Sequence, residues 1–226
     1  MKKRILIYNC DFDKGRLNTA LVIKKLLHNF NVSIVTPHKY EFSSELADYD
    51  AFMMTGSRAN VDDKDVWIKR LADEIRKIKA LKSPMLGICF GHQIVAHALG
   101  GKVIRAKQQE FGYTKIELAK AGVANPLFKG ISKIFPTFEA HNYIVTEVPN
   151  EARILARNKH SIQSYSYRNF LGIQFHPEID YDIARLVAKR EGKELRATKE
   201  FLKEERAINE HILLNFGELV KRSKTK

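Results

Sequence analysis

The first part of the chain alternates between short apolar runs and longer amphipathic stretches. The apolar runs predict buried strands at residues 5–10, 32–35, 51–54 and 85–88. Between them, apolar residues recur every three or four positions over residues 18–30 and 68–78, which is the spacing of one helix face. Strands that alternate with helices favour an α/β fold with a three-layer, mostly parallel, doubly wound sheet and helices on both faces. The site of such a sheet lies at the carboxyl ends of its strands.

A different pattern begins near residue 102. Shorter segments with alternating apolar and polar positions predict strands at residues 103–104, 114–118, 143–145, 153–156 and 161–167. A period of two is typical of strands with one exposed face, so we predict a small antiparallel sheet here. Residues 180–226 have a helical composition rich in charge, which predicts a helical C-terminal extension.

The fourth apolar run ends in an unusual pattern, Gly87-Ile88-Cys89-Phe90-Gly91. A strand, a sharp turn with the nucleophile at its apex, and a helix directly after it together form a nucleophile elbow. Flanking glycines allow the backbone to pass close to neighbouring elements. The helix N-terminus favours the thiolate over the thiol. We therefore predict that Cys89 is a nucleophile.

A thiolate that attacks an acyl group needs a base, a group that orients the base, and donors for the oxyanion. The candidate base is His176, which follows a second apolar run and precedes a proline and Glu178. A carboxylate two residues from the imidazole points the same way and fixes its tautomer. For the oxyanion we expect the backbone amides of Phe90 and of Gly56, which lies in the glycine turn after the third strand.

Taken together, these motifs resemble the class I (triad-type) glutamine amidotransferase domain. The resemblance covers roughly residues 4 to 180 and rests on segments in the family's order: Gly56-Ser57, Gly87 to Gln93, Leu99 to Val103, Glu110 to Gly112, Ala140 to Tyr143, and His176-Pro177-Glu178. Residues 56–63, followed by Trp67-Ile68, are most similar to the GMP synthase-like branch. Members of that branch are free-standing amidotransferase domains related to the glutaminase part of GMP synthase.

The resemblance implies roles for individual residues of this chain. Cys89 becomes the nucleophile, His176 the base and then the acid, and Glu178 the residue that orients it. The positions that match substrate contacts of the family are Ser57, Gln93, Asn142 and Tyr143. The chemistry requires neither a cofactor nor a metal.

Two positions depart from the family pattern. Arg58 stands where many members have a proline in the oxyanion loop, and Ala140 stands where serine or asparagine is common. Without the proline the loop is freer to change conformation, so the sequence leaves open whether the oxyanion hole is preformed. Alanine removes any side-chain contact that the second position makes in other members.

The resemblance also implies a single class I domain over residues 1–226. Residues 212–220 resemble the closing helix of the family. The charged helical segment before it, about residues 181–208, then becomes an insertion. Most insertions of this composition are solvated surface, and a lid or a partner surface is the alternative.

Composition narrows the class of protein. The chain has 226 residues, of which 44% are hydrophobic and 29% charged, which suits one large α/β domain with a substantial core. With only two cysteines, we expect no disulfide framework and a reducing, cytoplasmic environment. The first apolar run is too short for a signal peptide, and no segment approaches the ~20 apolar residues of a membrane span. We expect a soluble protein without membrane contacts.

A formal net charge of +13 and a pI near 9.7 raise the question of nucleic-acid binding. The lysines and arginines are scattered over predicted helices and mixed with glutamates, and no nucleic-acid-binding motif accompanies them. We therefore do not expect a nucleic-acid partner. A solvated surface rich in Lys and Glu, as in thermophiles, or an acidic protein partner accounts for the charge instead.

Several other reactive residues have plain structural interpretations. Cys10 ends the first strand and is expected to be a buried structural thiol. His92 lies on the helix after Cys89, where packing is a better explanation than catalysis. The sequence leaves open whether His141 and Glu110 act indirectly in the site or only anchor loops.

These observations leave three hypotheses. The first is a glutaminase that releases glutamate and ammonia and supplies a separate synthase chain, because no synthetase segment is present. The same residues would also cleave a γ-glutamyl peptide, since only the leaving group differs. The second is a regulatory protein that kept the fold without catalysis, and the third is a protease or chaperone relative of the elbow-cysteine fold. The complete set Cys89, His176 and Glu178 favours the first hypothesis.

Overall fold

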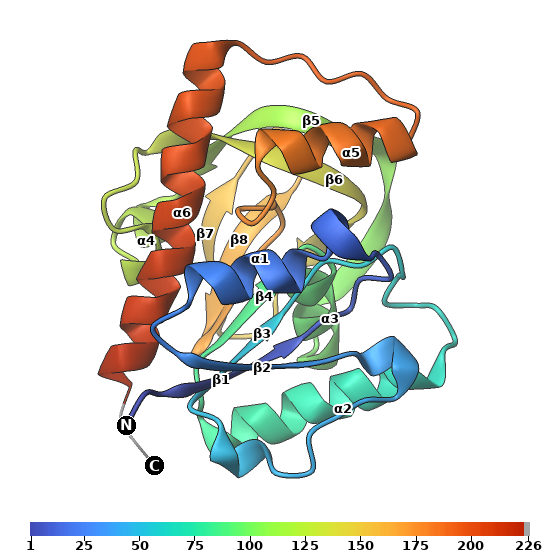
Figure 1. The fold of residues 1–226 in the computed structure, drawn as a ribbon, viewed down its shortest axis with the longest axis vertical. Coiled ribbons are helices and arrows are strands. Elements are labelled where there is room, and N and C mark those ends of the chain that lie inside the picture. Colours follow the sequence, from blue (N-terminus) through green and yellow to red (C-terminus); the bar gives the residue numbers. More distant parts are fainter. Residues whose placement is uncertain (224–226) are drawn as a thin grey trace.

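The computed structural model describes residues 1–223, and these form one nine-stranded sheet in the order β2-β1-β3-β4-β9-β8-β7-β5-β6 (Figure 1). The strands are β1 (Arg4–Tyr8), β2 (Asn31–Val35), β3 (Ala51–Met54), β4 (Met85–Ile88), β5 (Lys102–Leu118), β6 (Ile134–Glu147), β7 (Arg153–Arg157), β8 (Ile162–Tyr167) and β9 (Phe170–Ile173). The five strands from β2 to β9 in this order are parallel, and the remaining pairs are antiparallel.

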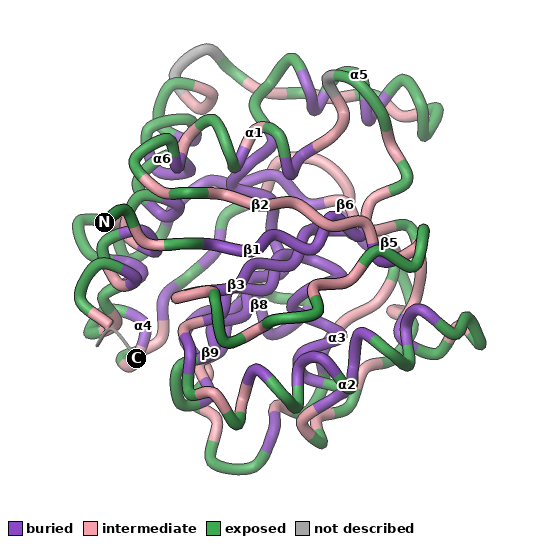
Figure 2. The backbone as a smooth tube through the Cα atoms, turned by 60° about the horizontal axis from the view of Figure 1, so that its bottom comes forward, coloured by how far each residue is buried: buried purple, intermediate pink, exposed green. Residues whose placement is uncertain are grey.

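Helices cover both faces of the sheet. They are α1 (Thr19–Leu26), α2 (Val66–Leu81), α3 (Phe90–Ala98), the short α4 (Lys120–Val123), α5 (Tyr181–Arg190) and α6 (Lys199–Arg222). Alternate residues of each central strand point into two different cores, one on each face of the sheet. In β1, for example, Ile7 packs with residues of α1 and α6, whereas Leu6 packs with residues of α2 and α3. Figure 2 shows the buried residues concentrated along the central strands. The predicted three-layer, doubly wound α/β fold is confirmed.

The antiparallel strands extend the parallel sheet instead of forming a sheet of their own. Strand β8 pairs with β9, so the predicted small antiparallel sheet is continuous with the rest. Strand β5 also joins the predicted segments 103–104 and 114–118 into one long strand. Its pairing with β6 shifts register between Arg105 and Glu110, which is where the sequence pattern breaks.

The strand order places three loops at one edge of the sheet. Because β1 lies between β2 and β3, the chain leaves β1 and β3 in opposite directions, and such a switch point opens a crevice at the carboxyl ends of the strands. The loops that follow β1, β3 and β4 all begin at this edge. Residue Cys89 directly follows β4.

The C-terminal part contains two helices joined by residues 191–198 (Figure 1). The predicted closing helix at residues 212–220 is part of α6, which begins earlier, at residue 199. The charged segment 199–208 forms the first turns of α6. Whether residues 181–208 are an insertion within the family stays a prediction. Among the described residues, no helix is both long and apolar enough to cross a membrane.

Glu205 of α6 is buried with 1% exposure and accepts a hydrogen bond from Asn209. Burial raises the pKa of Glu205 to about 7. Because this value lies above that of the unfolded chain, the ionised carboxylate destabilises the fold at high pH. We expect Glu205→Gln to raise the free energy of unfolding by up to about 3 kcal/mol at pH 8. The gain shrinks as the pH falls through 7 towards 4.5, where wild-type Glu205 is protonated in both states.

Denaturant unfolding at pH 8 and pH 5 measures this difference. Glu210→Gln is the matched control, because Glu210 lies on the same helix with a side chain that is 47% exposed. We expect the control to change stability by less than about 0.5 kcal/mol. A Glu205→Gln variant no more stable than the wild type at pH 8 would contradict the account.

Candidate active site

Cys89 occupies a strained turn between β4 and α3. Its backbone has φ 51° and ψ −104°, a conformation that residues other than glycine rarely adopt. The amide of Cys89 donates to the carbonyl of Ile173 at 2.9 Å, and its carbonyl accepts from the amide of Gln93 at 3.0 Å. Such strain is of the order of 1–3 kcal/mol and persists only where the surroundings hold it. The elbow geometry predicted from the sequence is therefore present.

The two flanking glycines allow this turn. A Cβ atom on Gly87 would lie 2.4 Å from the carbonyl oxygen of Gly91. A Cβ atom on Gly91 would lie 2.5 Å from the carbonyl oxygen of Met54, at the end of β3. Both obstacles are backbone atoms, which cannot rotate away. The glycines therefore let α3 begin directly against the sheet, with Cys89 at the apex.

His176 and Glu178 are paired beyond the end of β9. Nδ1 of His176 lies 2.9 Å from Oε1 of Glu178, and both residues are buried. The amide of His176 donates to the carbonyl of Phe138 at 3.0 Å, which fixes the backbone of this segment to β6. The other ring nitrogen, Nε2, is buried and has no hydrogen-bond partner among the described residues.

Gly56 lies against both Cys89 and His176. A Cβ atom on Gly56 would be 3.0 Å from Cε1 of His176 and 3.5 Å from Cβ of Cys89. Burial works against a charged imidazole, but the Cys89 sulfur and the Glu178 carboxylate raise the pKa of His176 well above its ordinary value. The structure thus brings the predicted sulfur, imidazole and carboxylate together, with the glycine loop beside them.

The backbone amides expected to form an oxyanion hole lie next to Cys89. Phe90 is the first residue of α3, where an amide has no carbonyl partner within the helix. On the opposite side, the carbonyl of Gly56 accepts a hydrogen bond from the Thr55 hydroxyl at 3.0 Å. That hydroxyl also accepts from the amide of Cys10 at 2.9 Å. These bonds anchor the loop although Arg58 replaces the family's proline.

Two cavities meet at Cys89. The small cavity has a volume of about 60 Å³ and is bordered by Cys89, Gly56, His176 and Glu178 together with residues of α5. The large cavity has a volume of about 220 Å³ and is bordered by the four predicted substrate-contact residues, Ser57, Gln93, Asn142 and Tyr143. Apart from Phe90, whose backbone amide is the predicted group, every predicted site residue borders one or both of these cavities.

The large cavity offers several polar groups. The side chain of Gln93 donates to the carbonyl of Tyr143 at 2.8 Å and to Gln174 at 3.1 Å, so it also holds β6 against α3. The register shift between β5 and β6 gives His141 and Tyr143 partners on β5 but leaves Asn142 between them unpaired. Asn142 thus lies at the register shift, and it also borders the large cavity.

A buried ionic cluster borders the large cavity. Nε2 of His141 lies 3.1 Å from Glu139 and 3.3 Å from Glu110. Although burial opposes charge, the neighbouring carboxylates of Glu110 and Glu139 raise the pKa of His141 to about 10. Sequence reasoning singled out His141 and Glu110 without settling their role, and it missed Glu139. The two-residue spacing of Glu139 and His141, which puts them on one face of a strand, was the available signal.

The remaining reactive residues lie apart from this chemistry. Cys10 is a free, fully buried thiol, and burial raises its pKa far above the ordinary range. His92 is fully buried against Tyr165, with ring centroids 4.8 Å apart, and burial lowers its pKa to about 3. Both structural interpretations are confirmed. No cluster of three potential metal ligands occurs within the described part of the chain.

Sequence reasoning missed a charged group at the mouth of the small cavity. Asp13 forms ion pairs with Arg190, at the end of α5, and with Arg58 at 3.7 Å. The nearby Asp11 also borders the cavity, and burial together with the charge of Asp13 raises its pKa to about 6. The position of these residues after β1, at the carboxyl edge of the predicted sheet, was the signal that would have found them.

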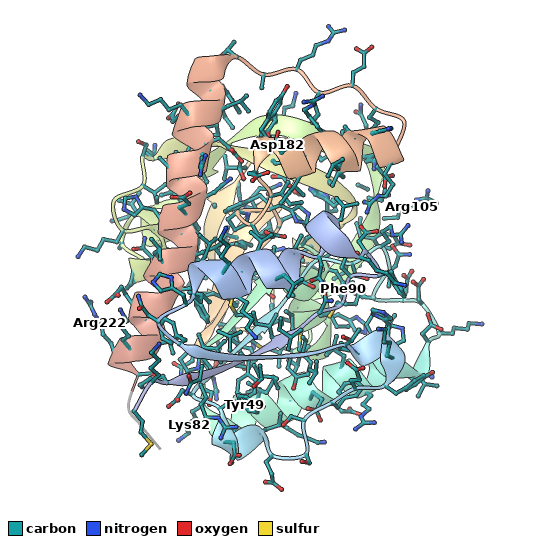
Figure 3. The ribbon with its side chains drawn as sticks, viewed as in Figure 1. Tyr49, Lys82, Phe90, Arg105, Asp182 and Arg222 are labelled. Atoms are coloured by element: carbon teal, nitrogen blue, oxygen red, sulfur yellow. The ribbon has the colours of Figure 1, made fainter. Side chains whose placement is uncertain are left out.

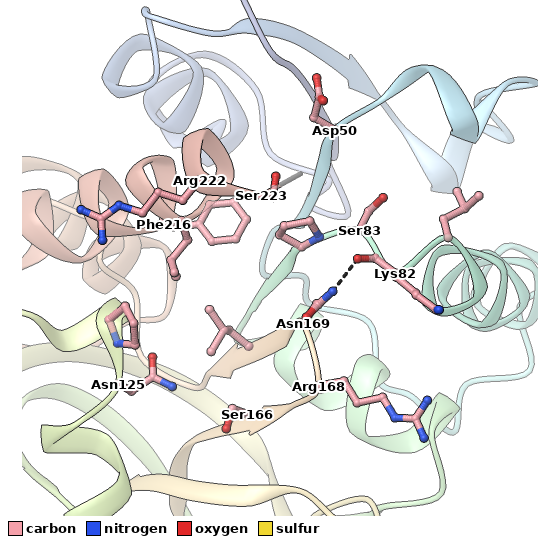
Figure 4. Close-up of a pocket in the computed structure, with 15 residues that line it drawn as sticks. Asp50, Lys82, Ser83, Asn125, Ser166, Arg168, Asn169, Phe216, Arg222 and Ser223 are labelled. Atoms are coloured by element: carbon pink, nitrogen blue, oxygen red, sulfur yellow. Dashed lines mark hydrogen bonds between the residues drawn. The ribbon is translucent and has the colours of Figure 1, made fainter. Parts of the chain in front are cut away.

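A larger cavity of about 680 Å³ lies at the opposite edge of the sheet (Figure 4). Its wall includes Lys82 and Ser83, which precede β4, Asn169, which precedes β9, and Phe216 of α6. Figure 3 shows Phe90, the neighbour of Cys89, well away from Lys82. No described residue that borders this cavity borders either of the two cavities at Cys89.

The doubly wound sheet with a strained cysteine, a buried His–Glu pair and a glycine loop defines a class of α/β proteins with an elbow nucleophile. The family model "Glutamine amidotransferase class-I" matches residues 12–184. The chain belongs to the class-I glutamine amidotransferase family.

Named relatives fall into two groups. The chain is 33% identical over 165 residues to a subunit of the glutamine-hydrolyzing GMP synthase of Saccharolobus solfataricus, a match that covers 71% of this chain and 84% of the relative. It is 34% identical over 154 residues to gamma-glutamyl peptidase 4 of Arabidopsis thaliana, covering 66% of this chain and 61% of the relative. The chain is thus related both to subunits of GMP synthase and to γ-glutamyl peptidases.

Solved structures agree with the fold. A glutamine amidotransferase from Thermotoga maritima superposes with a TM-score of 0.83 at 20% identity, covering 99% of this chain and 100% of the other. A glutamine amidotransferase from Methylobacillus flagellatus gives a TM-score of 0.79 at 19% identity, covering 99% and 96%. At these identities the likeness concerns the fold alone.

Proposed function

We propose that the chain hydrolyses the side-chain amide of glutamine to glutamate and ammonia through a γ-glutamyl thioester on Cys89. The observation that carries the proposal is the close approach of Cys89, His176 and Gly56 at the strained elbow, with Glu178 behind the imidazole. A cysteine thiolate beside an oriented imidazole is the arrangement that acyl transfer requires. The reaction needs no cofactor and no metal.

The first half of the reaction forms the thioester. The Cys89 thiolate attacks the side-chain carbonyl carbon, and the new C–S bond places the negative charge on the carbonyl oxygen. The amides of Gly56 and Phe90 hold this oxyanion. His176, kept charged by the neighbouring sulfur and carboxylate, gives its proton to the leaving nitrogen as the C–N bond breaks. Ammonia departs, and the glutamyl group remains on Cys89.

The second half hydrolyses the thioester. His176, now neutral, takes a proton from water, and the water oxygen attacks the thioester carbonyl. The C–S bond breaks, glutamate leaves and the thiolate is restored. Glu178 stabilises the imidazolium at both stages through its 2.9 Å contact with Nδ1. Each oxyanion donor contributes about 10²–10³-fold to the rate of such reactions.

The large cavity is the proposed site of the glutamyl half of the substrate. Its polar border includes the predicted contacts Ser57, Gln93, Asn142 and Tyr143. In this proposal the backbone around Asn142, at the register shift between β5 and β6, binds the charged α-amino and α-carboxyl groups. The anchored position of Gln93 between α3 and β6 keeps this border rigid.

We further propose that the released ammonia supplies a separate synthase chain in the cytoplasm. The relation to proteins named as subunits of glutamine-hydrolyzing GMP synthase supports a synthase of that type as the partner. We propose that residues 1–226 act as one class I domain in this role. The expectation that the chain binds no nucleic acid stays a prediction.

A γ-glutamyl peptide hydrolase is the second candidate. The relation to proteins named gamma-glutamyl peptidase, at 34% and 36% identity, favours it. The same three residues would act, and the leaving group would be an amino acid instead of ammonia. A non-catalytic regulatory role has less support, because all three residues are present, His176 is paired with Glu178, and Cys89 and His176 both adjoin Gly56.

Glutamate release from purified protein tests the proposal. The substrates are glutamine and a panel of γ-glutamyl dipeptides, and the steady-state rates are compared with those of heat-denatured protein. We expect turnover of glutamine, with the higher kcat/KM for glutamine over the dipeptides. Turnover of dipeptides alone would replace the proposal with the peptide hydrolase. No turnover of any substrate, with or without a synthase chain of the GMP synthase type, would favour the regulatory role.

A further inference from the structure

Asp13 holds two arginines at the mouth of the small cavity. Arg190 comes from the last turn of α5, and Arg58 comes from the loop after β3. The Asp13 side chain is only 13% exposed, whereas Arg190 and Arg58 are 27% and 54% exposed. A carboxylate between two guanidinium groups is a favourable arrangement, because Arg190 adds a hydrogen bond to its charge and Arg58 adds a second positive charge at 3.7 Å. All three residues border the small cavity together with Cys89, which is 4% exposed.

The small cavity lies on the side from which a leaving group departs. His176 borders the small cavity, and the proposed function requires it to give its proton to the leaving nitrogen. The glutamyl half has its polar border in the large cavity, which His176 does not border; Arg58 and Arg190 border both cavities. A leaving amino acid would therefore extend into the small cavity, towards Arg58 and Arg190.

We propose that Asp13 is a specificity-determining residue, whose carboxylate occupies the two arginines that would otherwise bind the carboxylate of a leaving amino acid. The inference rests on the proposed function and decides between its two substrate classes. In the structure, Asp13 occupies the position beside the two arginines where the carboxylate of the leaving amino acid would bind. Ammonia has no such group and needs no such partner.

The size and charge of the cavity agree with this role. A water-sized molecule needs about 10–15 Å³, so 60 Å³ accommodates a few waters or ammonia but little more. Two carboxylates, Asp11 and Asp13, and two guanidinium groups, Arg58 and Arg190, border this space, so no positive charge is left over for an anionic leaving group while Asp13 is present. Removal of the Asp13 carboxylate both enlarges the space and leaves two cations facing it.

Contacts other than the one with Asp13 hold Arg190 in position. Nε of Arg190 contacts Glu191 at 3.0 Å, which orients the guanidinium group. Beyond the helix, Lys193 donates to Gln109 and lies 4.9 Å from the ring centre of Phe111, so the end of α5 is tied across to β5. Arg190 is thus held in place independently of Asp13, and it remains available when the carboxylate is removed.

Steady-state kinetics with three substrates test the inference. Glutamine releases ammonia, γ-glutamylglycine releases an amino acid with a carboxylate, and γ-glutamylethylamide releases an uncharged amine of intermediate size. Three variants are compared. Asp13→Asn removes the charge and keeps the side-chain volume, Asp13→Ala removes both, and Asp13→Glu keeps the carboxylate. Thermal melting of each variant checks that the fold is retained.

We expect the ratio of kcat/KM for γ-glutamylglycine to that for glutamine to rise about tenfold or more in Asp13→Asn and Asp13→Ala. The ratio for γ-glutamylethylamide should rise less than about threefold, because that leaving group cannot pair with arginine. Asp13→Glu should behave like the wild type. Adding Arg190→Ala to Asp13→Ala should return the γ-glutamylglycine ratio towards its wild-type value.

The possible failures are distinct. Folded variants that release glutamate from glutamine with an unchanged γ-glutamylglycine ratio would overturn the inference alone. So would a raised ratio that persists in the double variant, because the arginine would then play no part. Absence of glutamate release from all three substrates, in the wild type and every variant, would overturn the proposed function and this inference with it.

Discussion

Cys89→Ala is expected to lower the rate of glutamate release by about 10⁴-fold or more, because no other group can form the thioester. The change removes only the sulfur, so the fold should be retained. Alanine keeps the Cβ that already fits at φ 51°, and the backbone bonds of residue 89 to Ile173 and Gln93 do not involve the side chain. Glutamate release under saturating glutamine, together with a thermal melt, measures both consequences.

Cys10→Ala is the matched control for this variant. Cys10 is the other free cysteine among the described residues, is fully buried, and follows β1. Its replacement should leave kcat within about twofold, while lowering stability by about 1 kcal/mol through lost packing. If Cys89→Ala retained a tenth or more of the wild-type rate, another mechanism would be required.

Gly87→Ala is expected to cause the largest loss of stability that a single added methyl group can produce in this site. The new Cβ would lie 2.4 Å from the carbonyl oxygen of Gly91 and 2.8 Å from the amide nitrogen of His92. Because both are backbone atoms of α3, relief requires the helix to shift away from β4. Overpacking of this kind destabilises by about 3 kcal/mol or more. Urea unfolding of the purified variant measures the change.

Gly217→Ala provides the comparison. Gly217 lies in α6, and its added Cβ would be 3.1 Å from a ring carbon of Phe30, which can move by a few tenths of an ångström. Replacing a helical glycine with alanine also favours the helix by about 1 kcal/mol. We expect a net change within about 1 kcal/mol. Equal losses for the two variants would show that contact with the backbone of α3 is not what makes Gly87 necessary.

The parts of the fold that the sequence predicted have local signals. The strands β1 to β4 are short apolar runs, and the elbow combines two glycines with a cysteine within five residues. The pairing of His176 with Glu178 follows from their spacing and the intervening proline. Each signal lies within a few residues of the chain, so a single sequence is sufficient to recognise it.

The parts that were missed depend on distant contacts. Strand β6 begins at Ile134, with Pro136 inside it, and its pattern identifies it as a strand only once β5 lies beside it. The ion pair of Asp13 joins it to Arg190, 177 residues away along the chain. Likewise, Glu139 belongs to a buried cluster in which His141 contacts both Glu139 and Glu110 of the neighbouring strand. Spacing can place two charged residues on one face of a strand, but only the tertiary structure shows which residues of other strands meet them.

Covalent trapping of the thiol tests the central claim most directly. A diazoketone analogue of glutamine alkylates a nucleophile that lies beside its reactive carbon, and peptide mass spectrometry identifies the modified residue. The account predicts one adduct, on Cys89, whose formation slows in excess glutamine and fails in His176→Ala, because the imidazole that maintains the thiolate is absent. Modification of Cys10 instead, or labelling of Cys89 at a rate that glutamine does not affect, would contradict it.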